Sequence, residues 1–222
     1  MTDSVKVIHY GDESHILYIA RVSSNQENTD PGLLRYLVEK GHWSPFEMVG
    51  ACVEINTTRD IGRQILRHRS FSFQEFSGRY ASYDELISER QLRFKGTSNR
   101  QGSRYAETPG EMALQDDLVE AVRQLALGAT NLYKLMDENG IALECARAIL
   151  PEGLVPTRMY MNGTLRSWIH YIRERTKLDE RTGEILAQRE HYNIAKKIKQ
   201  HLSILFPTTF AALAQIGYFD EG

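Results

Sequence analysis

The chain has 222 residues, 41% of them hydrophobic, which is enough to bury one sizeable core, so we expect one domain over residues 1–222. A formal net charge of -2 argues against a general nucleic-acid-binding surface. No apolar run approaches the roughly 20 residues that cross a bilayer, and the first residues lack signal-peptide features, so we expect a cytoplasmic protein without a membrane partner. Cys52, Cys145 and the scattered histidines show no metal-ligand spacing, so no metal site is expected.

Short strands and helices alternate in the first quarter of the chain. We expect a strand over residues 5–10, a helix over residues 13–22 and a second helix over residues 33–40, which Gly41 ends. Residues 48–56 alternate apolar and polar side chains, which is the period of a half-buried strand.

The next predicted helix begins after a capping threonine and runs to about Arg69. Its arginines Arg59, Arg63 and Arg67 recur four residues apart on one side. Like charges at this spacing cost on the order of 0.2 to 0.5 kcal/mol per pair unless a counter-ion lies between them. A bound phosphate, or a carboxylate from a neighbouring subunit, would supply that counter-ion.

A strand over residues 71–76 and a turn at Gly78 should follow. Residues 91–95 could pair in the same sheet, and we interpret the polar residues 96–107 as a mobile loop.

Helices dominate the second half. A capping box at residues 108–111 opens a long helix, which ends at residues 139–140 and whose apolar repeat we interpret as scaffold. Further helices are expected over residues 141–150, from Thr164 onward, and over residues 183–206, where Pro207 ends the last one.

Residues 67–80, RHRSFSFQEFSGRY, concentrate hydrogen-bonding side chains. Residues 59–80 contain five arginines against Asp60 and Glu75, a local charge of +3 in a chain of charge -2. Arginine holds phosphate or carboxylate through two hydrogen bonds at once, so the stretch favours an anionic small molecule. A solvated basic face and a nucleic-acid patch are the alternatives. Interleaved aromatic residues argue against the first, and the overall acidity argues against the second.

The stretch also carries a motif: Arg67-His68-Arg69, seven residues, then Ser77-Gly78-Arg79. It resembles the signature of the flavin-dependent thymidylate synthases. HWSPFE from residue 42, ARAILP from residue 146 and NGTLRSWIHYIRER from residue 162 also resemble that family. The resemblance covers roughly residues 42–175.

The resemblance implies a fold and an activity. The fold would be a single α+β domain with a mostly antiparallel sheet packed against long helices. The enzyme would be a homotetramer with FAD sites at subunit interfaces. It would methylate dUMP reductively to dTMP, taking the carbon from 5,10-methylenetetrahydrofolate and the electrons from NADPH through FAD, and release tetrahydrofolate. No G-x-G-x-x-G element follows a strand, so a Rossmann site for NADPH is not expected.

The resemblance also implies three sets of site residues. The flavin contacts would be Ser44, Arg67, His68, Arg69, Glu75, Thr164, Arg166 and His170. The dUMP contacts would be Gln64, Arg67, Glu75, Ser77, Gly78, Arg79, Arg147 and Arg175, with the phosphate at Arg79 and Arg147. The catalytic residue would be Arg175, at the uracil ring.

The implied chemistry suits these residue types. A cation held against N3 and O2 of uracil favours the N3-ionised ring and raises the electron density at C5, which must attack the incoming carbon. Neither cysteine lies in a ligand-like segment, and Ser77 has no evident His-Asp relay, so we interpret Ser77 as a dUMP contact. A nucleic-acid-binding module and a nucleotide-binding regulatory protein without turnover remain the competing hypotheses.

Overall fold

The computed structural model describes residues 3–23, 30, 32–83, 86, 90–96 and 102–219. These residues divide into two compact units whose segments interleave along the sequence. The helical unit contains Asn56–Gln64 and Glu75–Arg158. The sheet unit contains Asp3–Ile55, Ile65–Gln74 and the residues from Met159 onward. A single domain over residues 1–222 stays a prediction.

The sheet has four strands, β1 (Ser4–Tyr10), β2 (Gly50–Thr58), β3 (Ser72–Glu75) and β6 (Pro156–Thr164), in the order β1-β2-β6-β3. Alternate residues of β2 are buried, as its sequence pattern predicts. The antiparallel sheet and the large helical content confirm the α+β expectation.

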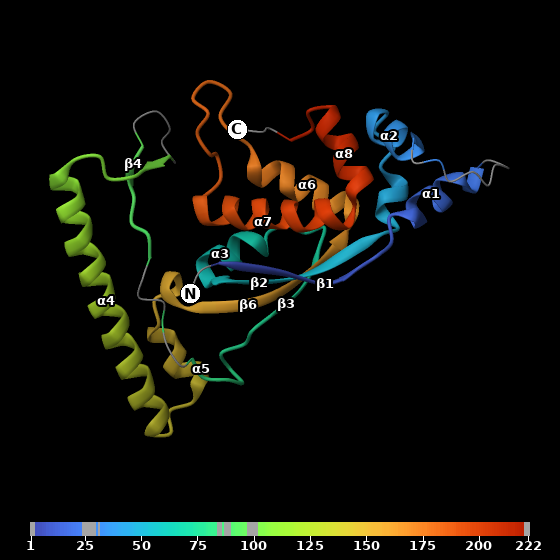
Figure 1. Ribbon diagram of the computed structural model, residues 1–222. Helices are drawn as coiled ribbons and strands as arrows, with labels where there is room; N and C mark the ends of the chain where they lie inside the picture. Colours follow the sequence, from blue (N-terminus) through green and yellow to red (C-terminus); the bar gives the residue numbers. More distant parts are fainter. Residues whose placement is uncertain are drawn as a thin grey trace. The chain divides into compact units, whose positions relative to one another are not determined.

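Helix α7 (Arg189–Leu205) packs against β1 and lies, with α6 (Leu165–Thr176), over one face of this sheet (Figure 1). The sheet unit also contains α8 (Pro207–Gln215), which packs on α7 and on α2 (Gly32–Glu39). It further contains α1 (Ser14–Ala20) and short 3-10 helices at Arg21–Ser23 and Ser44–Glu47. Gly41 has a φ of 66° directly after α2, which confirms the predicted helix end. Trp168 is fully buried in α6, and its indole N–H donates to the Ala51 carbonyl at 3.0 Å.

The helix predicted over residues 183–206 begins later than expected, ends next to Pro207 as predicted, and is not the last helix. Residues 183–188 are not helical, because the backbone turns at Gly183 and Ile185 forms a bridge with Leu178. Pro207 begins a further helix, α8, because proline lacks the N–H that the first turn of a helix does not use.

The helical unit contains α3 (Arg59–Ile65), α4 (Pro109–Glu138) and α5 (Leu143–Ala146). The last residue of α3, Ile65, already belongs to the sheet unit. Arg147–Ile149 and Glu152–Leu154 are 3-10 helices. Thr108 caps α4 by accepting a hydrogen bond from the Glu111 N–H, as the capping box predicts. Helix α3 stops four residues before Arg69 in a turn where the His68 N–H bonds to the Ile65 carbonyl.

Residues 91–95 do not join the main sheet. Their last two residues form β4 (Phe94–Lys95), which pairs with β5 (Ser103–Arg104) in a separate two-stranded ladder. The Arg104 guanidinium ties this ladder to α4 through two hydrogen bonds to Glu111. Part of the predicted loop is therefore a strand, and its residues 97–101 lie outside the described part of the chain.

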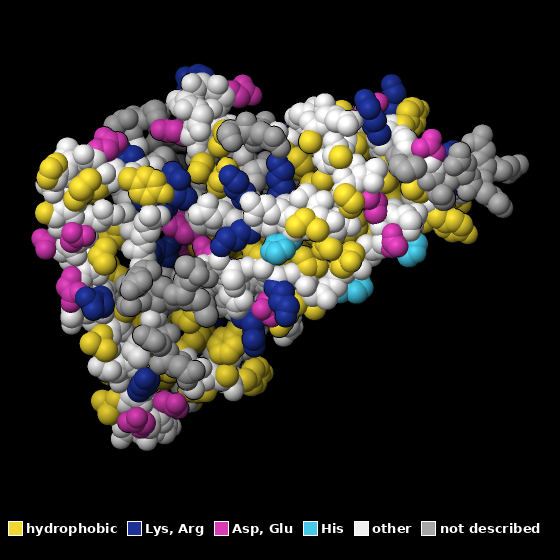
Figure 2. Space-filling view, in the orientation of Figure 1, with side chains coloured by type: hydrophobic (Ala, Val, Ile, Leu, Met, Phe, Trp, Pro, Cys, Tyr) yellow, Lys and Arg dark blue, Asp and Glu magenta, His cyan; other side chains and the backbone are white. Residues whose placement is uncertain are grey.

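Helix α4 departs from the scaffold interpretation. Its buried residues are Ala126, Thr130 and Tyr133, of which Ala126 and Tyr133 belong to a core with Tyr83 and neighbours from residues 143–155. The leucines that dominate its apolar repeat are exposed, and hydrophobic side chains recur along the helix surface (Figure 2). Within the described residues, no helix is long and apolar enough to cross a membrane.

Candidate active site

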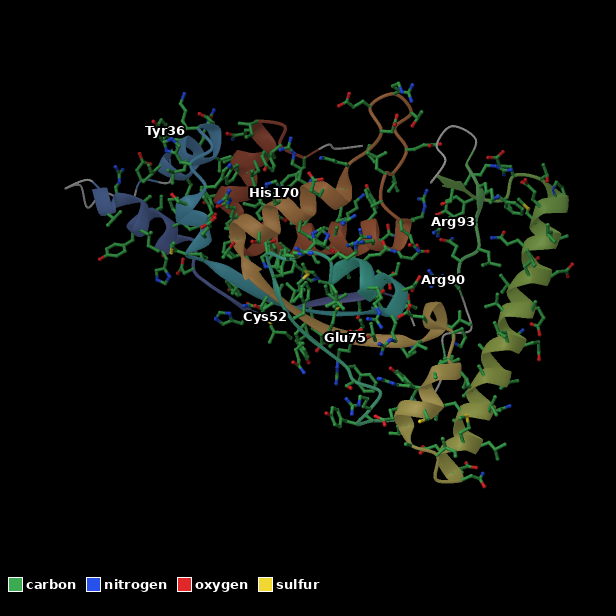
Figure 3. All side chains as sticks on the ribbon, turned by 180° about the vertical axis from the view of Figure 1, so that it is seen from behind. Tyr36, Cys52, Glu75, Arg90, Arg93 and His170 are labelled. Atoms are coloured by element: carbon green, nitrogen blue, oxygen red, sulfur yellow. The ribbon has the colours of Figure 1, made fainter. Side chains whose placement is uncertain are left out.

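A half-open cavity of about 390 Å³ lies in the sheet unit. It is lined by Glu47 from a 3-10 helix, by His68, Ser70 and Phe71 from the segment before β3, and by Arg166, Ser167, His170, Tyr171 and Glu174 from α6. The α6 residues recur at three- and four-residue steps, which places them on one side of a helix. Figure 3 labels His170 among the side chains of α6.

His68 and Arg175 meet through a direct hydrogen bond. The Arg175 Nε–H donates to His68 Nε2 at 2.9 Å. Burial, together with the smaller effect of the nearby Arg175 charge, lowers the pKa of His68 to about 4. His68 is therefore neutral near pH 7, and it accepts at Nε2 only as the tautomer protonated on Nδ1.

Arg166 is paired across the same cavity with Glu47. Both side chains are about two-fifths exposed, at 44% and 41%. The pair joins α6 to the 3-10 helix that contains Ser44, and an anionic ligand at Arg166 would compete with the Glu47 carboxylate.

The other flavin contacts that the sequence predicts in this unit divide into two kinds. Thr164 is the N-cap of α6, where its hydroxyl accepts from the Ser167 N–H at 3.2 Å. Ser44, Arg67 and Arg69 are exposed and are not among the described residues that line the cavity. The structure thus brings together His68, Arg166 and His170, with Arg175 behind His68.

A second cavity, of about 340 Å³, lies in the helical unit and contains Arg147. Two further arginines line it. The Arg63 Nε–H donates to Glu152 at 2.8 Å, and an Arg59 Nη1–H donates to the Tyr83 hydroxyl at 2.9 Å. The cavity therefore combines three guanidinium groups with carboxylates from Glu144 and Glu152.

The remaining predicted dUMP contacts of the helical unit surround Gly78. Gly78 is buried, and a Cβ atom there would lie 2.6 Å from the Tyr83 ring, so the position has room only for glycine. Ser77 Oγ accepts from the Arg79 N–H at 3.4 Å. Arg79 pairs with Glu144 at 3.3 Å.

Glu75 and Gln64 belong to the same unit. Glu75 accepts a hydrogen bond from the Thr157 hydroxyl at 2.8 Å, which ties it to the start of β6. Gln64 is half-buried near the end of α3. All predicted dUMP contacts except Arg67 and Arg175 therefore belong to the helical unit. Most predicted flavin contacts belong to the sheet unit.

Sequence reasoning missed several residues of the two cavities. Tyr171 and Glu174 were not singled out, although Tyr171 stands four residues before Arg175 and Glu174 stands four residues after His170 on α6. Arg59 and Arg63 were identified, with Arg67, as crowded arginines in need of a counter-ion. Their partners were not predicted, because the side chains that accept their hydrogen bonds lie far away in the sequence.

Residues 6–208 match the family described as thymidylate synthase complementing protein. A relative from Paramecium bursaria Chlorella virus 1, named a probable flavin-dependent thymidylate synthase, is 44% identical over 207 residues, which cover 90% of each chain. A relative from Synechocystis sp., named a flavin-dependent thymidylate synthase, is also 44% identical, over 211 residues covering 90% of this chain and 89% of the relative.

A solved structure has the same fold. It is PolB, a UMP/dUMP methylase from Streptomyces cacaoi bound with 5-Br dUMP, and it matches with a TM-score of 0.81 over 99% of this chain and 97% of that chain. At 24% sequence identity this likeness supports the fold alone.

Proposed function

Because the chain belongs to the thymidylate synthase complementing protein family, that of the flavin-dependent thymidylate synthases, we propose that it methylates dUMP reductively to dTMP. The observation that carries the proposal is 44% identity over 90% of the chain to two relatives of that name. The cavity supports it, because His68, Arg166 and His170 converge there from two segments far apart in the sequence.

The sheet-unit cavity suits part of a flavin nucleotide. Phe71 offers apolar ring surface, Ser70 and Ser167 offer hydroxyls, and Arg166 offers a cation for a phosphate. We propose FAD as the cofactor, held by His68, Arg166 and His170 in this cavity. Ser44, Arg67, Arg69 and Thr164 of the same unit and Glu75 of the helical unit are the further proposed contacts. When bound, the flavin supplies hydride transfer, while the protein binds and orients the reactants.

The co-substrates follow from the balance of the reaction. C5 of dUMP loses a proton and gains a methylene carbon from 5,10-methylenetetrahydrofolate, and one hydride turns that methylene into a methyl group. If NADPH provides the hydride, the folate leaves as tetrahydrofolate and NADP⁺ is the oxidised product. We propose this stoichiometry, in which the folate gives up a carbon but no electrons.

Arg175 is the proposed catalytic residue. Its guanidinium would face N3 and O2 of the uracil ring and stabilise the ring in its N3-ionised form. The structure supports this role in one respect: the hydrogen bond from Arg175 Nε ends on the neutral ring of His68, so that acceptor does not compensate the arginine charge.

The dUMP phosphate is proposed to bind Arg79 and Arg147. Arg147 lines the helical-unit cavity together with Arg59 and Arg63, so positive charge is concentrated there. Glu144, which pairs with Arg79 at 3.3 Å, would have to release that guanidinium when a phosphate arrives. Gln64, Glu75, Ser77 and Gly78 are the remaining proposed contacts of this unit.

We propose that the chain assembles as a homotetramer with active sites at subunit interfaces. An exposed seam along α4 supports self-association. It consists of Leu114, Leu118, Ala121, Leu125, Gly128, Leu132 and Leu135, whose spacing alternates between four and three residues as in a coiled coil. Leu125 is 58% exposed and Leu135 is 56% exposed, whereas such apolar stripes in soluble proteins are normally covered.

Substitutions on and off the seam test the proposed self-association. Leu125→Glu should lower the particle mass measured by light scattering. Leu127→Glu changes a leucine that is 54% exposed but lies off the seam, and should not. Equal masses in both variants would contradict the proposed seam.

The visible spectrum tests the proposed function. Purified protein should show bound flavin absorbance, which anaerobic NADPH should bleach at a rate that dUMP alters. Protein that stays colourless after FAD is added would contradict the flavoenzyme. Strongly salt-dependent oligonucleotide binding by such protein would favour the nucleic-acid module. Binding of dUMP without flavin reduction would favour a regulatory protein.

A further inference from the structure

Two buried side chains lie behind the contact between His68 and Arg175. Tyr171 on α6 is 1% exposed and His191 on α7 is 0% exposed. The Tyr171 hydroxyl and His191 Nε2 are 3.0 Å apart, so the two groups share a hydrogen bond. Tyr171 lies within the stretch from residue 162 that resembles the family but was assigned no contact there, and His191 lies outside every such stretch.

The His68 ring packs directly on this pair. Its centroid is 4.8 Å from the Tyr171 ring at an interplanar angle of 81°, and 6.1 Å from the His191 ring at 89°. The Tyr171 ring is also enclosed by Phe71 and Trp168, both with centroids 5.9 Å away. The orientation of His68 is therefore set by the Tyr171 ring. The hydroxyl of Tyr171 anchors that ring to His191 on α7.

All three groups are neutral near pH 7. Burial lowers the pKa of His191 to about 3, and burial raises the pKa of Tyr171 above its ordinary value. Two arginines that line the cavities are instead paired with carboxylates, Arg166 with Glu47 and Arg63 with Glu152. A neutral support thus orients the Arg175 guanidinium without placing a counter-charge against it.

We propose that Tyr171 and His191 are positioning residues, which fix the His68 ring and through it direct Arg175 toward the bound pyrimidine. The pair itself does not touch the substrate. Its effect is to reduce the reorientation that Arg175 must undergo when negative charge develops on the ring. That Arg175 is directed toward a pyrimidine rests on the proposed function. The geometric link among Arg175, His68, Tyr171 and His191 does not depend on that function.

Tyr171→Phe is the direct test, because it removes the hydroxyl and keeps the ring on which His68 packs. The matched control is Tyr160→Phe, which removes a hydroxyl hydrogen bond to Glu54 at 2.8 Å elsewhere in the same unit. We expect Tyr171→Phe to lower kcat for dTMP formation about tenfold, with flavin binding and flavin reduction by NADPH within about twofold of wild type. The control should retain both activities.

Two results would overturn the inference. One is a Tyr171→Phe enzyme with wild-type kcat, and the other is an equal loss of flavin reduction and methylation, which indicates a structural defect. Substitutions of His191 give a second test: His191→Gln, which keeps a polar partner for the hydroxyl, should retain more methylation than His191→Leu. Equal activities of these two variants would also count against a positioning role.

Crystal structures of wild type and Tyr171→Phe separate this inference from the proposed function. Loss or rotation of the Arg175 to His68 contact in the variant supports the link, and an unchanged contact overturns it, whichever reaction the wild type catalyses. A wild type that fails to methylate dUMP would contradict the proposed function, while the geometric result would still decide the link.

Discussion

The cavity beside α6 and the cavity beside Arg147 both contain arginine, but they hold it differently. Beside α6, Arg175 donates to a half-buried neutral histidine, which rests on the buried pair Tyr171 and His191. Beside Arg147, Arg63 donates to a carboxylate, and the side chains of that pair are 57% and 52% exposed. A buried neutral support favours a fixed cation for catalysis, whereas exposed ion pairs can exchange their carboxylates for an arriving phosphate.

The largest expected effect is on Arg175. Arg175→Ala should lower kcat for dTMP formation by roughly 100-fold or more, because one preorganised donor at developing charge contributes about that much. Steady-state kinetics at saturating dUMP measures the change. Arg173→Ala is the matched control, since Arg173 lies on the same helix and stacks over Tyr218 at 4.5 Å. Similar losses in both variants would contradict a specific role for Arg175.

The buried histidines predict how stability depends on pH. Folded His68 and His191 have pKa values of about 4 and about 3, whereas the pKa of a histidine in the unfolded chain lies near its ordinary value of 6.5. Between these values the unfolded state holds more protons, so acidification from pH 6.5 toward pH 4 destabilises the fold. The limiting slope is about 1.4 kcal/mol per pH unit for each histidine.

Urea unfolding at several pH values measures this slope. His191→Asn should flatten it, although the variant is less stable overall. His201→Gln, which changes an exposed histidine on the same helix, should leave it unchanged. An equally steep slope in His191→Asn would show that other groups cause the acid sensitivity.

Gly78 tests the packing of the helical unit. Gly78→Ala places a methyl group 2.6 Å from the Tyr83 ring, so we expect a loss of about 1 to 3 kcal/mol in the free energy of unfolding. Gly110→Ala is the control, because nothing lies within 4 Å of a Cβ atom there. Chemical denaturation compares the two, and an unchanged stability in Gly78→Ala would mean that the Tyr83 ring moves aside freely.

The smallest effect should come from the exposed ion pairs. Arg63→Ala removes the pair with Glu152 and should change the free energy of unfolding by about 0.2 to 1 kcal/mol, because solvent screens both charges. Arg35→Ala, in an exposed pair with Glu39 on α2, should behave alike. A much larger loss for Arg63→Ala would show that the helical-unit cavity is preorganised as firmly as the cavity beside α6.

The sequence predicts those features that depend on a few neighbouring residues. Gly41 ends α2 and Thr108 caps α4, because each requires only local backbone and side-chain chemistry. The pairing of β4 with β5 was not predicted, because a short strand does not specify its partner. The leucine repeat of α4 indicates an apolar face without saying what covers it.

The site divides in the same way. The motif resemblance assigns His68, Arg166 and His170 to one flavin site, and the fold brings these three side chains to one cavity. The resemblance gives no role to Tyr171 or His191, which come from two helices and meet only in the folded chain. A lone histidine in an amphipathic helix has no local signal that separates a positioning residue from an ordinary core residue.

The folate product of the reaction tests the central claim most directly. Purified protein would be given FAD, NADPH, dUMP and methylenetetrahydrofolate labelled with carbon-13 at the methylene group. The products would be separated by chromatography and identified by mass spectrometry. We predict dTMP heavier by the label, together with equal amounts of tetrahydrofolate and NADP⁺. Dihydrofolate as the product, formed without NADPH, would contradict the proposed reaction, because the electrons would then have come from the folate.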